Sequence, residues 1–232
     1  MAQTFVLFDI DGTLLHSNKI DSECFSITYE RIYQKTFPSI DWRDYPHVTD
    51  HTIFRTVIRD HFDREAEADE MHYFREAFVA LLQEKRQSSP SDFLEVPNAR
   101  STVERLQSDD RYVTGIATGG WEQPAMVKLG HVGIPHGPMV MSFADNKVSR
   151  DEILSEAIGA ARQQFPHIER VVYIGDAPWD VETTRRMKVN FIGIRRRGDR
   201  EMLLQMGART VFQDYSDYPT FVKAIAEAQP PN

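Results

Sequence analysis

The sequence predicts an α/β protein whose core is a doubly wound, Rossmann-like parallel sheet, interrupted by an inserted all-helical cap domain. Short, continuously apolar runs are the first basis, because parallel strands covered by helices on both faces need them. The second basis is that helical stretches separate the later runs, as in repeated strand–helix units. The runs are residues 5–8, 113–117, 171–174 and 191–194, with weaker candidates at 139–143 and 210–212, and the helical stretches are 98–107, 121–129, 151–164 and 180–187.

The stretch between the first two strands has a different character. It contains three segments rich in helix formers, at residues 22–37, 49–62 and 65–87. Apolar side chains recur at helical spacing in the last of these, which is typical of a helix with one buried face. They are Met71, Phe74, Phe78, Leu81 and Leu82. We therefore expect a catalytic core made of residues 1–15 and 96–232, with residues 16–95 forming a cap that selects the substrate.

Composition narrows the class of protein. The 232 residues are 41% hydrophobic and 27% charged, which suits a soluble globular chain. The net charge of −8 disfavours a protein that grips nucleic acid, because such proteins concentrate positive charge. The sequence also shows no membrane-spanning run and no secretory signal, so we expect a cytoplasmic protein that binds neither nucleic acid nor membrane. The single cysteine, Cys24, excludes an internal disulfide framework.

Two carboxylates follow the first predicted strand. Asp9 and Asp11 stand at its carboxyl end, and Gly12 and Thr13 come next. Open α/β sheets bind ligands at this edge, and the glycine indicates a loop that can bring both acids around one small site. An acidic turn that only caps the strand is the alternative. A buried apolar strand that delivers paired acids makes this alternative less favoured.

A second pair of acids follows another apolar strand. Asp176 and Asp180 lie directly after residues 171–174. Four carboxylates at one sheet edge would repel one another, and a hard divalent cation resolves this repulsion. Oxygen ligands with residual waters suit Mg²⁺. Zinc is disfavoured, because the eight histidines are scattered without ligand spacing and there is only one cysteine.

A third strand end has the features of a phosphate site. Thr118 and two glycines, Gly119 and Gly120, connect residues 113–117 to a helical stretch. A hydroxyl, unhindered backbone N–H groups and the positive end of a helix all favour bound phosphate. A phosphoryl group beside carboxylates also needs a cation, for which Lys147 and Arg150 are the candidates. We choose Arg150, because it directly precedes a helix and its fork can bind phosphate and a carboxylate together.

In this order, the segments resemble the four motifs of the haloacid dehalogenase superfamily, and the resemblance covers nearly the whole chain. The helical insertion is similar to the cap of the phosphoglycolate phosphatase-like branch. The resemblance implies that Asp9 is the nucleophile that forms an aspartyl-phosphate, and that Asp11 protonates the leaving oxygen and then activates water. It implies Mg²⁺ bound by the Asp9 carboxylate, the Asp11 backbone carbonyl and Asp176, with Asp180 as a further ligand or an orienting residue.

The resemblance also implies that Thr118, Gly119 and Arg150 bind the phosphoryl oxygens. The family most often has a lysine at the basic position, so Lys147 stays open as the alternative to Arg150. The expected activity is Mg²⁺-dependent hydrolysis of a small phosphorylated metabolite, by a monomer or a homodimer. Asp11 disfavours dehalogenation, because release of halide from carbon needs no protonated alkoxide.

Several other functions stay open at this point. A phosphomutase would use the same residues but transfer the phosphoryl group instead of releasing it to water. A phosphate-accepting regulatory domain also uses an aspartate at a parallel sheet edge, but it would lack the inserted helices. A catalytically silent binding protein is disfavoured, because every expected carboxylate is present. Candidate substrate-selecting residues are Thr49, Asp50, His51 and Arg55 in the insertion, Trp121 and Glu122 after the phosphate turn, and the run Arg195, Arg196 and Arg197.

Overall fold

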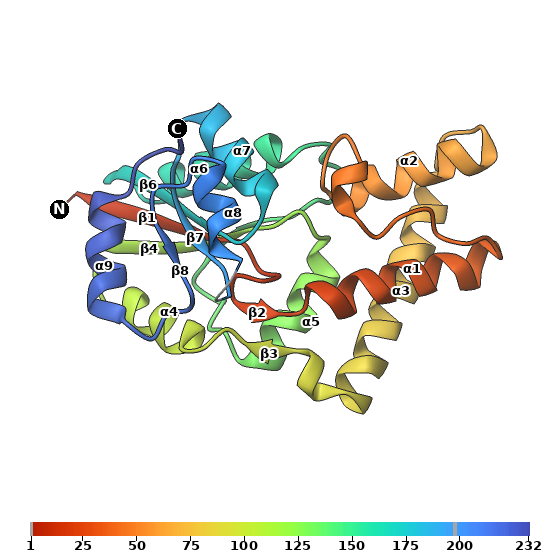
Figure 1. Ribbon diagram of the computed structural model, residues 1–232, viewed down its shortest axis with the longest axis horizontal. Coiled ribbons are helices and arrows are strands. Elements are labelled where there is room, and N and C mark those ends of the chain that lie inside the picture. Colours follow the sequence, from red (N-terminus) through yellow and green to blue (C-terminus); the bar gives the residue numbers. More distant parts are fainter. Residues whose placement is uncertain (1, 197–198) are drawn as a thin grey trace.

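A parallel sheet of six strands forms the centre of the molecule (Figure 1). The computed structural model describes residues 2–196 and 199–232. The strands are β1 (Gln3–Phe8), β4 (Tyr112–Ala117), β5 (Val140–Ser142), β6 (Ile168–Gly175), β7 (Asn190–Ile194) and β8 (Val211–Phe212). Their order in the sheet is β5-β4-β1-β6-β7-β8, and each pairing is parallel. The α/β class and all six expected strands are confirmed.

Helices surround this sheet. The described helices that follow the insertion are α4 (Ala99–Gln107), α5 (Glu122–Val132), α6 (Arg150–Gln164), α7 (Pro178–Met187), α8 (Arg200–Gln205) and α9 (Tyr218–Glu227). The first four lie within two or three residues of the predicted bounds, whereas α8 and α9 were not predicted. Within the described part of the chain, no helix is both long and apolar enough to cross a membrane.

Strand β1 lies in the middle of the sheet, and its last four residues are completely buried. It pairs with β4 on one side and with β6 on the other. Phe5, Val6, Leu7 and Phe8 have no exposed surface. Continuous burial on both faces explains why this run is apolar without alternation. The chain order reverses on either side of β1, and an α/β sheet opens a crevice at the carboxyl ends of its strands at such a place.

The inserted segment lies beyond the carboxyl ends of the strands, on the opposite side of the molecule from the chain termini (Figure 1). It consists of helices α1 (Asn18–Tyr33), α2 (Asp50–Phe62) and α3 (Ala68–Ser88), with two short 3₁₀ helices, η1 (Trp42–Asp44) and η2 (Pro90–Asp92). Helix α1 begins and ends four residues earlier than the prediction. It ends because Gln34 adopts a left-handed conformation, with φ of 54°.

A short antiparallel ribbon connects the insertion to the sheet. Strand β2 (Leu15–His16) pairs with β3 (Leu94–Glu95), where the chain leaves the sheet and where it returns. The Val96 N–H also donates to the Leu14 carbonyl over 2.9 Å. The ribbon was not predicted, because two residues per strand give no periodicity to read. The division into a core and a cap stays a prediction.

An aromatic cluster packs the insertion against the start of α5. The Trp121 ring stacks on Phe25 of α1, with centroids 5.8 Å apart, and lies edge-on to Phe54 of α2 and Phe74 of α3. Trp121 has no exposed surface. Its side chain therefore packs the three inserted helices together and is not among the residues that line the cavity described below, contrary to the expectation that Trp121 helps to select the substrate.

Candidate active site

The loop after β1 carries the first two acids. Asp9 still pairs with the sheet, because its N–H donates to the Ile174 carbonyl over 2.9 Å. The chain then turns at Gly12, whose φ of 78° lies in the left-handed region that favours glycine. A Cβ atom on this residue would lie 2.0 Å from Asp176 Oδ2. Glycine is therefore required both by the turn and by the close approach of the loop to Asp176.

The second pair of acids follows β6. Asp176 comes directly after the strand, and Asp180 is the third residue of α7. Asp180 Oδ2 accepts a hydrogen bond from the Ala177 N–H over 3.0 Å, which satisfies a backbone donor at the start of the helix. Pro178 occupies the first helical position, where the missing N–H has no cost. The start of α7 thus fixes the direction of the Asp180 side chain.

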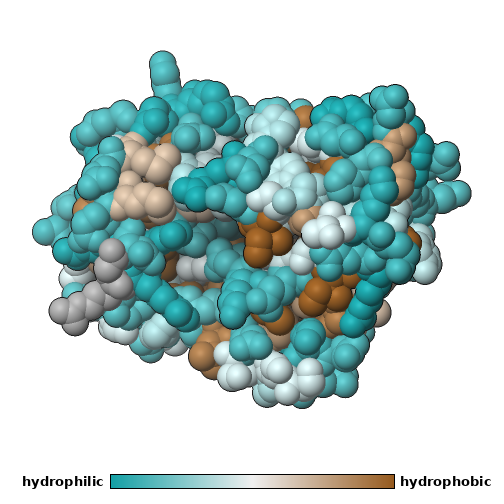
Figure 2. All heavy atoms as spheres, turned by 45° about the vertical axis from the view of Figure 1, so that its right-hand side comes forward, coloured by the Kyte–Doolittle hydropathy of each residue, from teal (hydrophilic) through white to brown (hydrophobic). Residues whose placement is uncertain are grey.

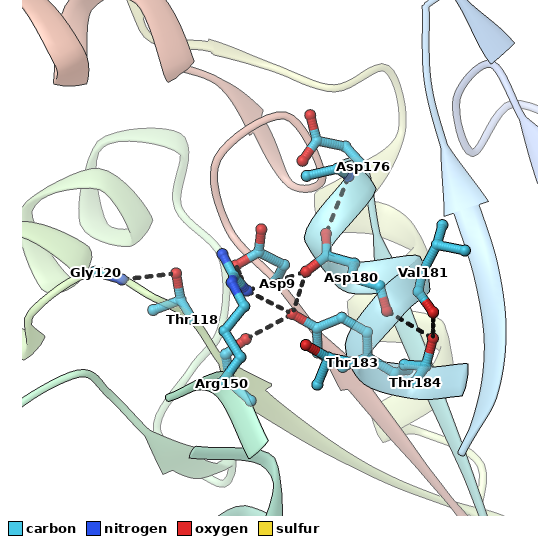
Figure 3. A network of polar contacts seen from close by, with 12 residues as sticks. Asp9, Thr118, Gly120, Arg150, Asp176, Asp180, Val181, Thr183 and Thr184 are labelled. Atoms are coloured by element: carbon cyan, nitrogen blue, oxygen red, sulfur yellow. Dashed lines mark hydrogen bonds and ion pairs between the residues drawn. The ribbon is translucent and has the colours of Figure 1, made fainter. Parts of the chain in front are cut away.

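Three of the predicted acids meet in one buried cluster (Figure 3). One carboxylate oxygen from each of Asp9, Asp176 and Asp180 lies within 4.8 Å of the other two. The most exposed of the three, Asp176, has only 6% of its surface exposed. The acids that follow β1 and β6 are therefore neighbours at one edge of the sheet. The Asp11 carboxylate is not among the groups that form this cluster within the described residues.

The surroundings of the cluster disfavour negative charge. Burial raises the pKa of Asp9 from 3.8 to about 7, against the opposing effect of Arg150 and with a further rise from Asp180 and Asp11. Burial likewise raises the pKa of Asp176 well above its usual range and raises that of Asp180. A cation bound between these groups would stabilise their ionised forms.

The cluster has the donors that a hard divalent cation needs. Among the described residues, none donates a hydrogen bond to the buried Asp9 Oδ1. A buried carboxylate oxygen without a donor is unfavourable, and such groups call for a specific reason. Coordination of a metal ion supplies one. The candidate side-chain ligands, from Asp9, Asp176 and Asp180, are all carboxylate oxygens, which hard cations prefer.

Arg150 provides the positive charge beside the cluster. It is the first residue of α6 and is 9% exposed. Its Nη1 donates to Asp180 Oδ1 over 3.0 Å and to the Tyr173 hydroxyl over 3.3 Å, and it lies 3.8 Å from Asp9 Oδ1. Lys147 Nζ instead pairs with Glu156 Oε2 at 2.8 Å. Of the two basic candidates, Arg150 is the one that contacts the acid cluster.

The turn after β4 places Thr118 and Gly119 on the wall of the same cavity. The Thr118 hydroxyl accepts a hydrogen bond from the Gly120 N–H over 3.3 Å, so this N–H already has a partner (Figure 3). At Gly119, a Cβ atom would lie 2.5 Å from the Val48 carbonyl oxygen and 3.0 Å from Arg150 Nη2. The insertion and the basic residue both approach the turn so closely that only glycine fits.

The acid cluster opens into a cavity of about 500 Å³. Six of the seven predicted site residues line it, and the seventh, Asp180, lies beneath them in the cluster. The surface is hollowed near the middle of the view in Figure 2, where apolar residues adjoin a largely hydrophilic rim. Apolar lining comes from Ile40, Trp42, Val48, Ile53, Trp179 and Met202.

Among the residues expected to select the substrate, Asp50 lines the cavity. Its N–H donates to the Gly119 carbonyl over 2.8 Å, and its Oδ2 accepts from the Trp121 N–H over 2.9 Å. The start of α2 is therefore attached to the phosphate turn. Thr49 has a different contact: it caps α2, accepting from the Thr52 N–H, and donates to the Val148 carbonyl over 3.2 Å.

The remaining substrate candidates have mixed positions. Arg55 pairs with Glu65 at 2.7 Å, and His51, Arg55 and Glu122 are not among the residues that line the cavity. Arg195 does line it, and its Nη1 donates to the Asp176 carbonyl over 2.7 Å. Arg196 lines a neighbouring cavity of about 460 Å³. Arg197 lies outside the described residues.

Sequence reasoning missed several polar residues near the acids. The hydroxyl of the buried Tyr173 donates to the Ala117 carbonyl over 3.1 Å and to Asp180 Oδ1 over 3.3 Å. Lys128, also buried, contacts Asp11 and Asp21. A signal for Lys128 was present, because it falls on the same face of α5 as the buried Ala125 and Leu129. Spacing alone does not distinguish such a lysine from one that reaches the surface.

Comparison with known families gives a match over most of the chain. The model of a family described as haloacid dehalogenase-like hydrolase matches residues 6–194. The matched region includes both acid pairs, the phosphate turn and Arg150. A search of curated protein sequences finds no match.

Solved structures of similar fold cover almost the whole chain. A hydrolase from Pseudomonas syringae has a TM-score of 0.71 at 19% identity, over 96% of this chain and 99% of its own. A protein provisionally assigned as a beta-phosphoglucomutase from Bacteroides vulgatus has a TM-score of 0.66 at 18% identity, over 97% and 90%. A predicted phosphoglycolate phosphatase from Haemophilus somnus has a TM-score of 0.62 at 16% identity, over 95% and 98%. At these identities the likeness shows the fold alone.

Proposed function

Because the chain belongs to the haloacid dehalogenase-like hydrolases, we propose that it is a Mg²⁺-dependent phosphatase that hydrolyses a small phosphorylated metabolite through an aspartyl-phosphate. One observation carries this proposal. The buried carboxylates of Asp9, Asp176 and Asp180 meet within 4.8 Å, beside the guanidinium of Arg150. Such a site can bind a divalent cation and an anionic group side by side.

Asp9 acts as the nucleophile. An oxygen of its carboxylate forms a bond to phosphorus, and the bond from phosphorus to the alcohol oxygen breaks with its electron pair on that oxygen. Arg150, the Thr118 hydroxyl and the backbone at Gly119 bind the phosphoryl oxygens, where negative charge is concentrated. The 3.8 Å between Arg150 Nη1 and Asp9 Oδ1 supports this role, because it puts the guanidinium next to the attacking group.

Asp11 acts as the general acid and base. Its carboxyl group gives a proton to the departing alcohol oxygen, and its carboxylate then takes a proton from the water that attacks the aspartyl-phosphate. The bond from phosphorus to the Asp9 oxygen breaks in this second step, with its electron pair on that oxygen, so the Asp9 carboxylate is regenerated. The sum of the two steps is ester plus water to alcohol plus inorganic phosphate. Asp11 lines the same cavity as Asp9 but stands apart from the acid cluster, which supports a role in proton transfer rather than as a carboxylate ligand of the metal.

Asp9 and Asp176 would hold the Mg²⁺ ion, with the Asp11 backbone carbonyl as a further ligand and Asp180 as a ligand or an orienting residue. When bound, the ion offsets the negative charge of the phosphoryl group and of the acids around it. The unpartnered Asp9 Oδ1 supports this assignment within the described residues. The contacts of Asp180 with Arg150, Tyr173 and Ala177 also suit an orienting role.

The proposal is tested with a panel of phosphate esters that includes sugar phosphates, phosphoglycolate and nucleotides. We expect release of inorganic phosphate from at least one ester in the presence of Mg²⁺. Chelation of the metal should abolish it. Asp9→Asn should abolish it as well, because a carboxamide is a far weaker nucleophile than a carboxylate. Analysis of the products separates hydrolysis from a phosphomutase reaction, which would give an isomeric ester and little free phosphate.

A matched control is Asp110→Asn. Asp110 is exposed and lies just before β4, at the amino end of the strands and so at the edge of the sheet away from the cluster. This variant should hydrolyse the same esters at the rate of the unaltered protein. Phosphate release that persists in Asp9→Asn, or with the metal chelated, would contradict the proposed mechanism.

A further inference from the structure

Lys128 is a buried cation that the proposed mechanism does not use. It lies on α5 and is 1% exposed. Its Nζ donates to Asp11 Oδ2 over 2.5 Å and to Asp21 Oδ1 over 2.8 Å. Burying an ammonium group is strongly unfavourable unless it is paired and hydrogen bonded. The two carboxylates satisfy this need, and one of them is the proposed general acid.

The second oxygen of Asp11 is held as well. Ser17 Oγ donates to Asp11 Oδ1 in a short hydrogen bond. Ser17 is 1% exposed and directly precedes α1. Both oxygens of the Asp11 carboxylate therefore have a donor, and the donors come from two different parts of the chain, Lys128 from α5 and Ser17 from the residue before α1. This pair of contacts sets the direction in which the carboxylate points.

If Lys128 served only to link α5 to α1, a pair with Asp21 would be enough, and the contact with Asp11 would have no explanation. Asp21, on α1, could by itself neutralise Lys128 and link the two helices. The shorter of the two contacts is instead with Asp11, in the loop that also carries Asp9. Helix α5 follows the turn of Thr118, so one strand-and-helix unit supplies both a phosphate-binding residue and the partner of Asp11. The contact of Lys128 with Asp11 therefore connects this lysine to the proposed general acid.

We propose that Lys128 is a positioning residue that, together with Ser17, orients the Asp11 carboxyl group for proton transfer to the leaving oxygen. The inference rests on the proposed function, because it takes Asp11 to be the general acid. Lys128 does not touch the substrate in this account. It acts through Asp11, and its loss should affect only those steps in which Asp11 moves a proton.

The acidity of the leaving group separates this role from a structural one. Phenyl phosphate and 4-nitrophenyl phosphate have nearly the same shape, but 4-nitrophenolate departs without a proton whereas phenolate departs far more readily with one. General acid catalysis is therefore needed more for phenyl phosphate. The value of kcat/KM includes only steps up to release of the phenol. The later attack by water, which both substrates share, does not enter it.

The test measures kcat/KM of Lys128→Met for both esters. We expect a loss for phenyl phosphate that is about tenfold greater than the loss for 4-nitrophenyl phosphate, in the same direction as for Asp11→Asn. Asp21→Asn should leave the ratio of the two values close to that of the unaltered protein, because the Lys128–Asp11 contact remains. Equal losses for both esters in Lys128→Met would overturn the proposal.

Two further variants guard against a defect of folding. Lys128→Met combined with Asp21→Asn leaves one unpaired carboxylate instead of two, so it should fold even if Lys128→Met does not, and it should show the same selective loss. Leu129→Ala removes a fully buried side chain next to Lys128 on α5. It should lower the melting temperature without changing the ratio. A changed ratio in Leu129→Ala would show that any disturbance of α5 has this effect and would also overturn the proposal.

Failure of the proposed role of Lys128 can be distinguished from failure of the proposed phosphatase activity. If Asp9→Asn still hydrolyses both aryl esters, the proposed function fails, and with it the premise of this inference. If Asp9→Asn is inactive and the ratio is unchanged in Lys128→Met, the phosphatase assignment stands and only the role of Lys128 fails.

Discussion

Arg150 Nη1 donates a hydrogen bond to Asp180 Oδ1 over 3.0 Å, and both side chains are buried, Arg150 in the wall of the cavity and Asp180 beneath it. The first residue of α6 is thereby tied to the third residue of α7, from a different strand–helix unit. Asp180 in turn accepts from the Ala177 N–H, which anchors it to its own helix. The guanidinium is held beside Asp9 by a side chain that is itself fixed.

Arg150→Met should abolish most of the activity and destabilise the protein. Removal of one partner of a buried ion pair costs about 3–5 kcal/mol, because Asp180 would be left without its counter-charge. Loss of a cation that stabilises a transition state lowers kcat by about 100-fold or more. Steady-state kinetics and urea unfolding measure the two effects. The control is Lys147→Met, which removes only the partly exposed pair with Glu156 and should change kcat less than twofold.

If Lys147→Met proves as damaging as Arg150→Met, the basic position of the site has been assigned to the wrong residue. The sequence alone left these two residues as alternatives. Glu156, which follows Arg150 on α6, distinguishes them, because its carboxylate pairs with Lys147 at 2.8 Å and so holds this lysine away from the cluster. Because α6 begins at Arg150, the Arg150 side chain lies at the carboxyl ends of the strands, whereas Lys147 precedes the helix.

Gly12→Ala should weaken metal binding and destabilise the protein. The left-handed conformation at φ of 78° costs an alanine about 1–2 kcal/mol. In addition, the new Cβ would lie 2.0 Å from Asp176 Oδ2, so the carboxylate would have to move. Titration of Mg²⁺ by calorimetry should show a lower affinity. Gly159→Ala, on the exposed face of α6 with open space around it, should instead stabilise by about 1 kcal/mol.

The sequence predicted most of the sheet and the acid pairs because each depends on local order. A run such as residues 5–8 is buried on both faces, and the acids follow the strand directly. Lys128 depends on something else. A lysine is rarely buried without a partner, and its partners, Asp11 and Asp21, lie more than 100 residues earlier in the chain. Only the folded chain brings α5 next to the loop after β1 and the start of α1.

Two other elements that were not predicted, the ribbon of β2 and β3 and helix α9, also depend on residues that are far apart in the sequence. The ribbon of β2 and β3 has two residues in each strand, and it exists only because the chain returns to the point at which it left the sheet. Helix α9 has an amphipathic sequence, but some of its partners are far away in the sequence. The Arg105 guanidinium lies over the Tyr218 ring, and Arg170 Nε donates to the Ile225 carbonyl over 3.2 Å. Local pattern predicts such elements poorly when tertiary contacts decide them.

Mg²⁺ should stabilise the protein more at pH 8 than at pH 5. Burial raises the pKa of Asp9 from 3.8 to about 7, so between these values the folded state retains a proton that the unfolded state has released. Without metal, stability therefore falls as the pH rises from about 4 to about 7. Bound Mg²⁺ replaces that proton as the partner of the carboxylate. Melting temperatures with EDTA and with Mg²⁺ measure the effect, and an equal shift at both pH values would contradict it.

Asp50→Asn should stabilise the protein at pH 6, and should stabilise it more strongly at pH 9. Burial raises the pKa of Asp50 from 3.8 to about 8, with a further rise from Asp21, against the opposing effect of the Trp121 N–H. The folded state thus holds a proton on Asp50 over a range in which the unfolded state does not, and stability is lost as the pH rises toward 8. An asparagine has the same shape, stays neutral and can still accept from the Trp121 N–H through its carbonyl oxygen. Asp50→Ala, which cannot accept this hydrogen bond, should be less stable than Asp50→Asn by about 1 kcal/mol at both pH values. Chemical unfolding at the two pH values measures these differences, and a loss of stability in Asp50→Asn at pH 9 would mean that the carboxylate is ionised and favourably paired in the folded protein.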